Sequence, residues 1–347
     1  MERSLRRGWQ SALVRQFGLR IWSAFVCRAH VSEGLFSSPK VPELRSGPSR
    51  PPRVLRQTPS DNDPKCIRYP RDVQSVLDLK EAHMYRQAVI TFIDILGFKH
   101  LIDTGTFEDV SRKLKTIRRL SDVDDQANGE CFEPKVIQFS DSIIRVRPLE
   151  SKANEESRYG LMFYEMLDLV HMQQELINHG ICVRGGVSIG NVHVDDQTLF
   201  GPGFVKAYEL ESVYANFPRI VVDPTLIQQL QRDKRLVSAH NTLKDEFAYI
   251  IKNIRRESDG IYFIDYLRAF QTEIDEPENI PVFLRNHKEL IVKNAGGATQ
   301  LNSVSAKYLW LASYHNSVIR EFKEEFWQRE ELEITPKEVP LLQAVEV

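Results

Sequence analysis

The sequence predicts an α+β sandwich whose elements follow one another as β-α-β-β-α-β, with the helices on one face of the sheet. Two apolar β-type runs support this prediction, Ala88–Phe98 (AVITFIDILGF) and Val136–Val146 (VIQFSDSIIRV). A third β segment, Ile181–Val194, follows a stretch with helical spacing, Glu155–Asn178. Short runs rich in Val, Ile and Phe are typical of strands, whereas apolar residues three or four apart are typical of helices.

The other elements can be assigned in chain order. Ala88–Ile95 is almost entirely apolar, so we expect a strand buried on both faces. The elements expected around it are a short helix at Asp72–Glu81, a helix over about Phe107–Leu120, two strands within Pro134–Arg147 around a turn at Ser140–Ser142, a helix over Gly201–Tyr214 and a strand at Arg219–Val222. Beyond them we expect the segment Gly260–Tyr266 (GIYFIDY), helices near Pro281–Ala295 and Ser303–Glu325, and a frayed chain after about Glu330.

The composition is that of an ordinary globular protein. The 347 residues are 42% hydrophobic and 27% charged, which suffices for one large domain or two small ones. No window reaches the roughly 18 uninterrupted apolar residues of a membrane span. The four cysteines are scattered and match neither a disulfide framework nor a zinc motif. This pattern indicates a reducing compartment, so we expect a cytoplasmic protein.

The charge is unevenly distributed along the chain. Residues 1–60 carry ten Arg and one Lys against three Glu, while the whole chain has a net charge of −2. The remainder is therefore acidic, which argues against nucleic acid as a partner. A metal-complexed anion is the better candidate, because its cation offsets the repulsion.

The N-terminal region looks separate from the rest of the chain. Residues 1–30 could form a basic amphipathic helix, and seven prolines between Ser37 and Pro64 indicate a linker. Three interpretations stay open: a mitochondrial-type presequence, a surface membrane anchor, or an extension without a role, such as one produced by an upstream start codon.

A single aspartate interrupts each of the two apolar runs, Asp94 in the first and Asp141 in the second. A lone carboxylate in an apolar strand is costly to bury unless it is paired or binds a metal. If the two strands lie side by side, both carboxylates reach one point and, with backbone carbonyls, make a hard oxygen site suited to Mg²⁺ or Mn²⁺. The alternative is that either residue simply caps a turn or a helix.

The four residues after Asp94 (ILGF) suggest a phosphate-binding turn. They lead from the strand toward a helix, and Gly97 lets the backbone approach a ligand closely. Successive N–H groups ahead of a helix can contact phosphate oxygens. The residues that we expect to bind nucleotide in this turn are Ile95, Leu96, Gly97 and Phe98.

A third motif combines the strand segment VRGGVSIGN with the segment GPGFVKAYELE that follows it. Arg184, Gly186 and Ser188 share one strand face. The paired glycines remove side chains where something packs closely, and the alternative is a β-bulge beside a helix. Lys206 is the best nearby cation for a triphosphate, unless it is only a solvated helix residue.

The motifs occur in the order F-x-D-I-x-G-F, S-D-S, R-G-G-x-x-x-G and A-Y-E-L-E. In this order they resemble the class III nucleotidyl cyclase catalytic domain, and most of all the bacterial pyrimidine nucleotide cyclases of the Pycsar antiphage system. The resemblance covers about Ala88–Pro224, and GIYFIDY with the following helices is also similar. It implies a class III cyclase-like, ferredoxin-like sandwich with a C-terminal helical extension. The regions are then a basic, Pro-rich extension (1–65), a nucleotide cyclase catalytic domain (69–270), C-terminal helices that pack on it (271–330) and a tail (331–347).

The resemblance further implies two-metal cyclisation of UTP or CTP to the 3′,5′-cyclic monophosphate and pyrophosphate. Asp94 and Asp141 would bind two Mn²⁺ or Mg²⁺ ions, and the backbone carbonyl of Ile95 would complete one metal site. Phe92, on the same strand face as Asp94, would border the base. Class III sites form between two subunits, so a homodimer is implied. The product would be a second messenger of infection that acts on a separate effector protein.

One part of the family pattern is missing. Familiar purine cyclases carry N-x-x-x-R on the last helix, and alignment with A-Y-E-L-E places Val205 and Glu209 at these two positions. Either Arg184 or Lys206 therefore supplies the missing catalytic charge, or the chain is inactive. The purine-selecting Lys and Asp are also not identifiable, which argues against an adenylate or guanylate cyclase.

Two other functions compete with the enzyme. A catalytically degenerate cyclase fold could bind and sense a nucleotide without turnover, although a binding module has no need of two metal-binding aspartates. A relative of polymerase palms or diguanylate cyclases would share the strand-aspartate arrangement, but the sequence contains no turn similar to G-G-D-E-F.

Overall fold

The computed structural model describes residues 85–121, 134–150, 153–273, 279–321 and 329–344. The chain divides into two units, Met1–Tyr69 and Pro70–Val347, and every described residue belongs to the second unit. The predictions for the N-terminal extension and for a helix at Asp72–Glu81 therefore lie outside the described residues.

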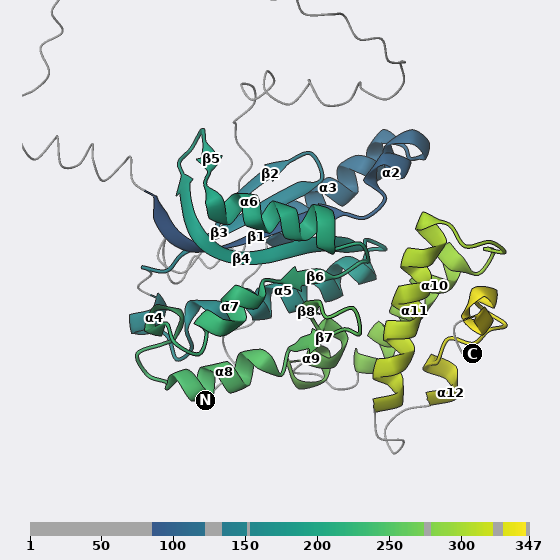
Figure 1. The fold of residues 1–347 in the computed structure, drawn as a ribbon. Helices are drawn as coiled ribbons and strands as arrows, with labels where there is room; N and C mark the ends of the chain where they lie inside the picture. Colours follow the sequence, from purple (N-terminus) through teal and green to yellow (C-terminus); the bar gives the residue numbers. More distant parts are fainter. Residues whose placement is uncertain (1–84, 122–133, 151–152, 274–278, 322–328, 345–347) are drawn as a thin grey trace, which may run out of the picture. The chain divides into compact units, whose positions relative to one another are not determined.

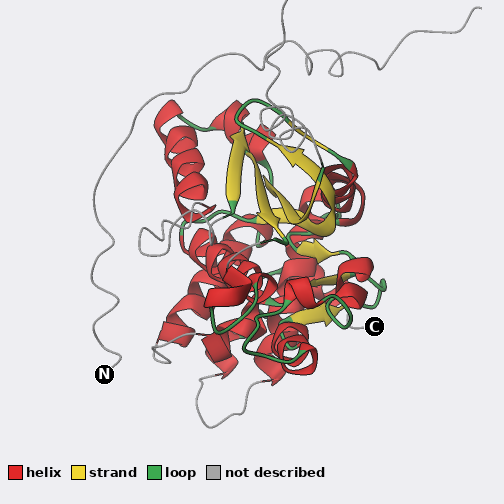
Figure 2. Cartoon of the chain, turned by 90° about the vertical axis from the view of Figure 1, so that its left-hand side faces the viewer, coloured by secondary structure: helices red, strands yellow, loops and turns green. Residues whose placement is uncertain are grey.

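The described strands form one sheet with a short additional strand at its side (Figure 2). They are β1 (Arg86–Ile95), β2 (Lys135–Phe139), β3 (Ser142–Pro148), β4 (Val183–Val194), β5 (Leu199–Phe200), β6 (Ile220–Val222), β7 (Ile254–Arg256) and β8 (Tyr262–Ile264). Their order is β2-β3-β1-β4-β6-β8-β7, and β5 pairs with β4. The mixed α/β class agrees with the prediction, and the first elements follow in the predicted order.

The helices before β6 are α2 (Phe98–Thr104), α3 (Phe107–Ser121), α4 (Ala153–Glu156), α5 (Leu161–Asn178), α6 (Pro202–Glu209) and the π-helical turn η2 (Leu210–Tyr214). Those after it are α7 (Pro224–Gln229), the 3₁₀ turn η3 (Lys234–Leu236), α8 (Leu243–Ile251), α9 (Tyr266–Glu273), α10 (Ile280–Ala295), α11 (Ser303–Glu321), α12 (Arg329–Leu332) and the 3₁₀ turn η6 (Pro340–Ala344). The single helix predicted over 155–178 is divided at Gly160. The Gly160 N–H donates to the carboxylate of Glu246 at 2.8 and 3.0 Å, so the backbone is extended there.

β1 is the central strand of the part of the sheet that carries the candidate site. It pairs antiparallel with β3 on one side and with β4 on the other. Ile93 lies opposite Ile143 of β3, and Asp94 lies opposite Arg184 of β4. The register between β1 and β4 is unbroken over all ten residues of β1, so the alternative of a β-bulge at the paired glycines is wrong.

Helices cover both faces of this sheet (Figure 1). Val89 and Ile93 of β1 belong to the same core as Met166 of α5, whereas Phe92 belongs to a core with Ala207 of α6. The prediction that all helices lie on one face is therefore wrong for α6. The physical reason is that β1 is apolar on both sides and each side must be covered.

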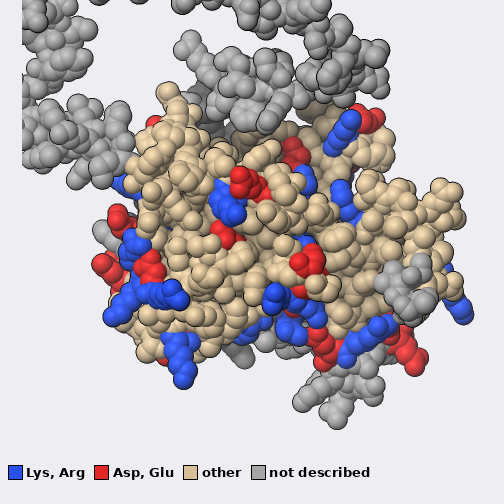
Figure 3. Space-filling model, viewed as in Figure 1, with Lys and Arg blue, Asp and Glu red and all other residues tan. Residues whose placement is uncertain are grey.

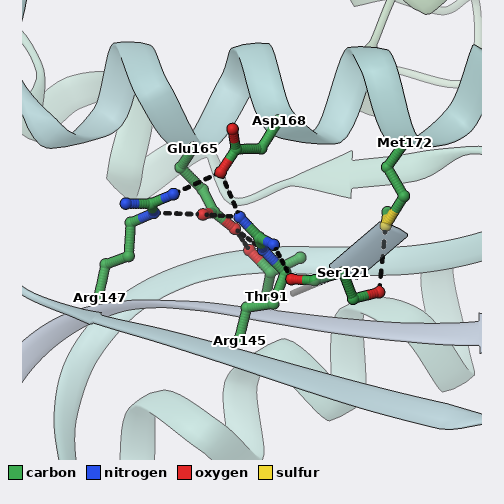
Figure 4. A network of polar contacts seen from close by, with 7 residues as sticks. All are labelled: Thr91, Ser121, Arg145, Arg147, Glu165, Asp168 and Met172. Atoms are coloured by element: carbon green, nitrogen blue, oxygen red, sulfur yellow. Dashed lines mark hydrogen bonds and ion pairs between the residues drawn. The ribbon is translucent and has the colours of Figure 1, made fainter. Parts of the chain in front are cut away.

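A buried ion network joins β3 to α5, and we call it the β3–α5 network (Figure 4). Arg145 donates hydrogen bonds to both carboxylate oxygens of Glu165, at 3.0 and 2.9 Å, and to Asp168 at 2.6 Å. Arg147 donates to Glu165 at 2.6 Å and also contacts Asp168, while Thr91 of β1 donates to Glu165 at 2.7 Å. Burial disfavours the Glu165 carboxylate, but the two guanidinium groups outweigh it and hold the pKa of Glu165 well below its usual range.

The C-terminal helices enclose a second apolar core together with the chain that follows α11. Ile334 and Val339 are fully buried in this core. The Asn316 side chain exchanges two hydrogen bonds of 2.8 Å with the backbone of Ile334. The expectation of a frayed chain after Glu330 is therefore wrong for residues 331–344, because scattered apolar residues anchor it.

The surface charge is mixed. On the face shown in Figure 3, acidic and basic side chains are interspersed rather than gathered into a field of one sign. A charged ligand at this face would therefore be bound by the few charged side chains next to it rather than by a long-range field of one sign. Within the described ranges, no helix is long and apolar enough to cross a membrane.

Candidate active site

Three polar residues meet at one end of the sheet, where β1, β3 and β4 lie side by side. Asp94 is the penultimate residue of β1 and faces Arg184 across the β1–β4 pair. Ser142, the first residue of β3, donates from Oγ to Asp94 Oδ1 at 3.3 Å. Arg184 Nη2 donates to Asp94 Oδ2, also at 3.3 Å. The Asp94 side chain is 18% exposed, so it is held by the sheet and still open to a ligand.

Asp141 reaches the same point from a tight turn. Phe139 of β2 pairs with Ser142 of β3, which leaves Ser140 and Asp141 as a two-residue hairpin turn. Ser140 has a φ of 56°, in the left-handed region. Asp141 therefore lies in the turn rather than within a strand. The structure brings Asp141 and Asp94 together, as the sequence pattern indicated.

The two carboxyl groups repel each other when both are ionised. Burial, the hydrogen bond with Asp94 and the negative charge of Asp94 together raise the pKa of Asp141 to about 6. A carboxyl group in this setting is stabilised either by a proton or by an added positive charge. The pair thus has unused capacity for a cation.

A third carboxylate, which the sequence analysis did not assign, completes the cluster. Glu211 lies in η2 with only 3% of its side chain exposed, and its Oε1 is 2.7 Å from Arg184 Nη2. This contact lacks hydrogen-bond geometry, and Oε1 has no hydrogen-bond partner among the described residues. Burial raises the pKa of Glu211 to about 7; Arg184 opposes the rise, while the negative charges of Asp94 and Asp141 add to it. We call Asp94, Asp141, Ser142, Arg184 and Glu211 the carboxylate site.

Gly186 is what lets Glu211 come so near to β4. A Cβ atom at Gly186 would lie 2.4 Å from Leu210 Cβ and 2.5 Å from the Ala207 carbonyl oxygen. Only a glycine therefore allows the end of α6 and η2 to rest directly on the strand. Ser188, on the same strand face, donates to the Gly203 carbonyl at 2.7 Å and fixes the start of α6.

The turn after Asp94 is placed as expected, but part of its backbone is already bonded. Gly97 has a φ of 78°, and α2, a helix that was not predicted, begins at the next residue, ahead of α3, which corresponds to the predicted helix. The Leu96 N–H donates to the Cys182 carbonyl at 2.9 Å, and the Leu96 side chain packs on the C-terminal core. Phe98 packs on the main core, and Ile95 is 4% exposed at the end of β1. The nucleotide-binding role of these four residues stays a prediction.

The remaining predicted residues lie around α6. Phe92 is 7% exposed, and its ring contacts the ring of Tyr208 with centroids 5.5 Å apart. Lys206 is half-buried on α6 and makes no hydrogen bond or ion pair with any described residue. Val205 and Glu209, at the positions of the missing Asn and Arg, are both exposed. The structure therefore brings Arg184, but not Lys206, into contact with the acidic side chains of the carboxylate site.

The carboxylate site fits a divalent cation by its donor set. Within the described residues, no group of three or more His, Cys, Asp and Glu side chains is arranged to hold a metal ion. Two carboxyl groups do converge, however, and burial together with the neighbouring Asp94 raises the pKa of Asp141. Hard carboxylate oxygens are the ligands that Mg²⁺ and Mn²⁺ prefer. Asp94 and Asp141 are thus the residues that would hold such an ion.

Comparison with known proteins finds distant likenesses among solved structures, and two of them are to an adenylyl cyclase and an adenylyl cyclase-like protein. One is a bacterial light-regulated adenylyl cyclase, with 15% sequence identity and a TM-score of 0.31 over 58% of this chain and 97% of that chain. The other is a class III adenylyl cyclase-like ATP-binding protein from Pseudomonas aeruginosa, with 13% identity and a TM-score of 0.31 over 48% of this chain and 40% of that chain. No family model and no curated protein matches the sequence. At these TM-scores neither likeness supports a statement about the topology or activity of this chain.

Proposed function

We propose that this chain is a class III-type nucleotidyl cyclase that converts a pyrimidine nucleoside triphosphate, UTP or CTP, to its 3′,5′-cyclic monophosphate and pyrophosphate. The observation that supports this proposal is the meeting of Asp94 and Asp141 at one end of the sheet, with Arg184 in contact. The order of the sequence motifs supports it independently. The proposal includes a homodimer, a cytoplasmic location and a role as second-messenger synthase in antiphage defence with a separate effector.

In this proposal each residue of the carboxylate site has its own role. Asp94 and Asp141 hold the cations, and Ser142 fixes the orientation of Asp94 through its 3.3 Å hydrogen bond. When bound, two divalent ions make the ribose 3′-hydroxyl a better nucleophile and neutralise the triphosphate. Arg184 is fixed by β4 and supplies positive charge where negative charge develops on the α-phosphate. Phe92 and the turn from Ile95 to Phe98 border the nucleotide.

The substrate class is tested directly. The purified chain is incubated with each of the four nucleoside triphosphates and Mn²⁺, and the products are identified by mass spectrometry. We expect cyclic UMP or cyclic CMP with pyrophosphate, and no product from the folded variant Asp94→Ala. A cyclic purine nucleotide as the main product would contradict the pyrimidine assignment, and no cyclic product from any of the four would contradict the enzyme.

A nucleotide sensor without turnover is the second candidate. Arg184 is already paired with two acids, and the exposed Glu209 stands where a catalytic Arg is expected. A chain of this kind would bind a nucleoside triphosphate without consuming it. Nucleotide binding by calorimetry together with unchanged nucleotide after long incubation would favour the sensor over the enzyme.

A further inference from the structure

Glu211 is an unusual residue to bury at this position. It sits in η2, where Leu210 beside it fills apolar space, and an apolar or amide side chain could occupy the same volume. Instead a third carboxylate is placed near two others, with one oxygen lacking a hydrogen-bond partner among the described residues. A buried carboxylate with incomplete pairing costs free energy of folding. A carboxylate kept here at that cost indicates a functional role for Glu211.

The contacts of Arg184 suggest that reason. A single nitrogen, Nη2, lies 2.7 Å from Glu211 Oε1 and 3.3 Å from Asp94 Oδ2. The guanidinium charge is thus divided between two acids, and the nearer acid is Glu211. Without Glu211, Asp94 would be the only acid within ion-pair distance of Arg184 among the described residues. The guanidinium would then pair more closely with Asp94 Oδ2, which it already contacts at 3.3 Å and which a divalent ion needs.

We propose that Glu211 is a positioning residue that draws Arg184 toward itself and limits its hold on Asp94 to one 3.3 Å hydrogen bond, so that Asp94 and Asp141 stay available to a divalent cation. The inference rests on the proposed function, in which this pair binds the metal ions. Gly186 supports this role, because it lets η2 approach β4 closely enough for Glu211 to reach Arg184. Arg184 thereby stays beside the cation site, and a cation bound by Asp94 Oδ2 has only one 3.3 Å hydrogen bond to displace.

The test is Mn²⁺ binding to the full chain in the absence of nucleotide, measured by titration calorimetry or by the electron paramagnetic resonance signal of free Mn²⁺. The variants are Glu211→Gln, Arg184→Gln and the double variant. We expect Glu211→Gln to weaken Mn²⁺ binding by about 10-fold or more, the usual scale for a residue that orients a metal site. In the Arg184→Gln background, Glu211→Gln should weaken Mn²⁺ binding by less than about 2-fold, since the competing guanidinium is gone.

Glu209→Gln is the matched control. It removes the same charge two residues away on an exposed position and should leave Mn²⁺ affinity unchanged. Glu211→Asp provides a second variant in case Glu211→Gln does not fold. It keeps the charge but shortens the reach to Arg184, so it should also weaken Mn²⁺ binding.

Two results would overturn the inference alone. Unchanged Mn²⁺ affinity in Glu211→Gln would show that Arg184 does not compete with the metal ion. Equal weakening with and without Arg184 would show that Glu211 acts by its own charge. A wild type that binds Mn²⁺ no better than Asp94→Ala would instead refute the proposed metal site, and the inference would fall with it.

Discussion

The β3–α5 network and the carboxylate site lie on opposite faces of β1 and are built from the same residue types. In the network, Arg145 and Arg147 face the carboxylates of Glu165 and Asp168, and these carboxylates are contacted by guanidinium groups or by the Thr91 hydroxyl. In the carboxylate site, Asp94 and Glu211 share the single guanidinium of Arg184, and Asp141 adds a third carboxyl group beside Asp94. The first cluster is complete without a ligand, whereas the second has acceptor capacity to spare.

The pKa shifts of the two clusters run in opposite directions for this reason. Burial disfavours ionised Glu165, yet two guanidinium groups more than offset it and lower its pKa. Burial also disfavours ionised Glu211, and one shared guanidinium does not offset it, so the pKa rises to about 7. The difference teaches that burial alone does not mark a functional carboxylate. An excess of carboxylates over their partners does.

The largest effect is expected at the two aspartates. Asp94→Ala or Asp141→Ala should abolish cyclic nucleotide formation and Mn²⁺ binding, because each removes a ligand of the proposed metal site. Both variants should stay folded, since neither residue belongs to the apolar core. Product analysis checks the loss of turnover, Mn²⁺ titration checks the loss of metal binding, and circular dichroism checks that each variant is folded. Near-normal turnover by either folded variant would show that the unbalanced cluster is not the active site.

The next effect is expected in the network and concerns stability. Glu165→Gln leaves two buried guanidinium groups without their main partner and should lower the free energy of unfolding by about 3–5 kcal/mol. Urea unfolding measures this loss. The control is Glu175→Gln, on the more exposed side of the same helix. That control should shift stability by no more than about 0.5 kcal/mol. A small loss of stability in Glu165→Gln would mean that the charges of the network are not fully paired, contrary to the comparison with the carboxylate site.

Part of this arrangement could be predicted from the sequence. Each of the two apolar runs contains one aspartate, and the preference of apolar runs to pair in a sheet brings Asp94 and Asp141 together. The network could not be predicted, because Arg145 and Arg147 alternate with apolar residues, as they would on a solvated strand face. Charge pattern alone does not reveal that Glu165, 18 or 20 residues later, covers them.

Glu211 and the C-terminal segment show a second limit. The small residues Gly203 and Ala207 on the strand side of α6 were the available signal for Glu211, which is four residues after Ala207. The π-helical turn then changes the helical phase, and no propensity predicts it. Residues 331–344 pack through apolar side chains without regular spacing, so periodicity gives no indication of their burial.

A smaller effect distinguishes the two candidate cations. Arg184→Ala should lower kcat by about 10²–10³-fold with little change in KM, the scale of one lost charge-stabilising donor. Lys206→Ala should have little effect, because Lys206 makes no contact with the carboxylate site. Steady-state kinetics of both variants decide between them. If both retain the wild-type kcat, the catalytic charge lies elsewhere, and Arg184 serves only to balance the carboxylates.

The smallest predicted effect concerns how Asp141 changes the stability of the protein with pH, and whether that change has the opposite sign to the one caused by Glu165. The pKa of Asp141 in the folded protein is about 6, above the value of 3.8 expected for a free aspartate. The folded state therefore holds this proton more tightly than the unfolded state, so the associated stability is fully present below about pH 4 and is lost as the pH rises through about 6. Asp141→Asn cannot ionise and escapes this loss.

Without divalent ions, Asp141→Asn should be more stable than the wild type at pH 8 and should lose that advantage at pH 4. The gain should be about 1 kcal/mol or less, because water screens a half-buried pair. Urea unfolding of both proteins across this pH range measures it, and the buried histidines, common to both, cancel in the difference. Glu165→Gln should be destabilising at pH 8, which is the opposite sign. Were Asp141→Asn also destabilising at pH 8, the Asp94–Asp141 pair would be as well balanced as the network, and the physical case for a cation there would be lost.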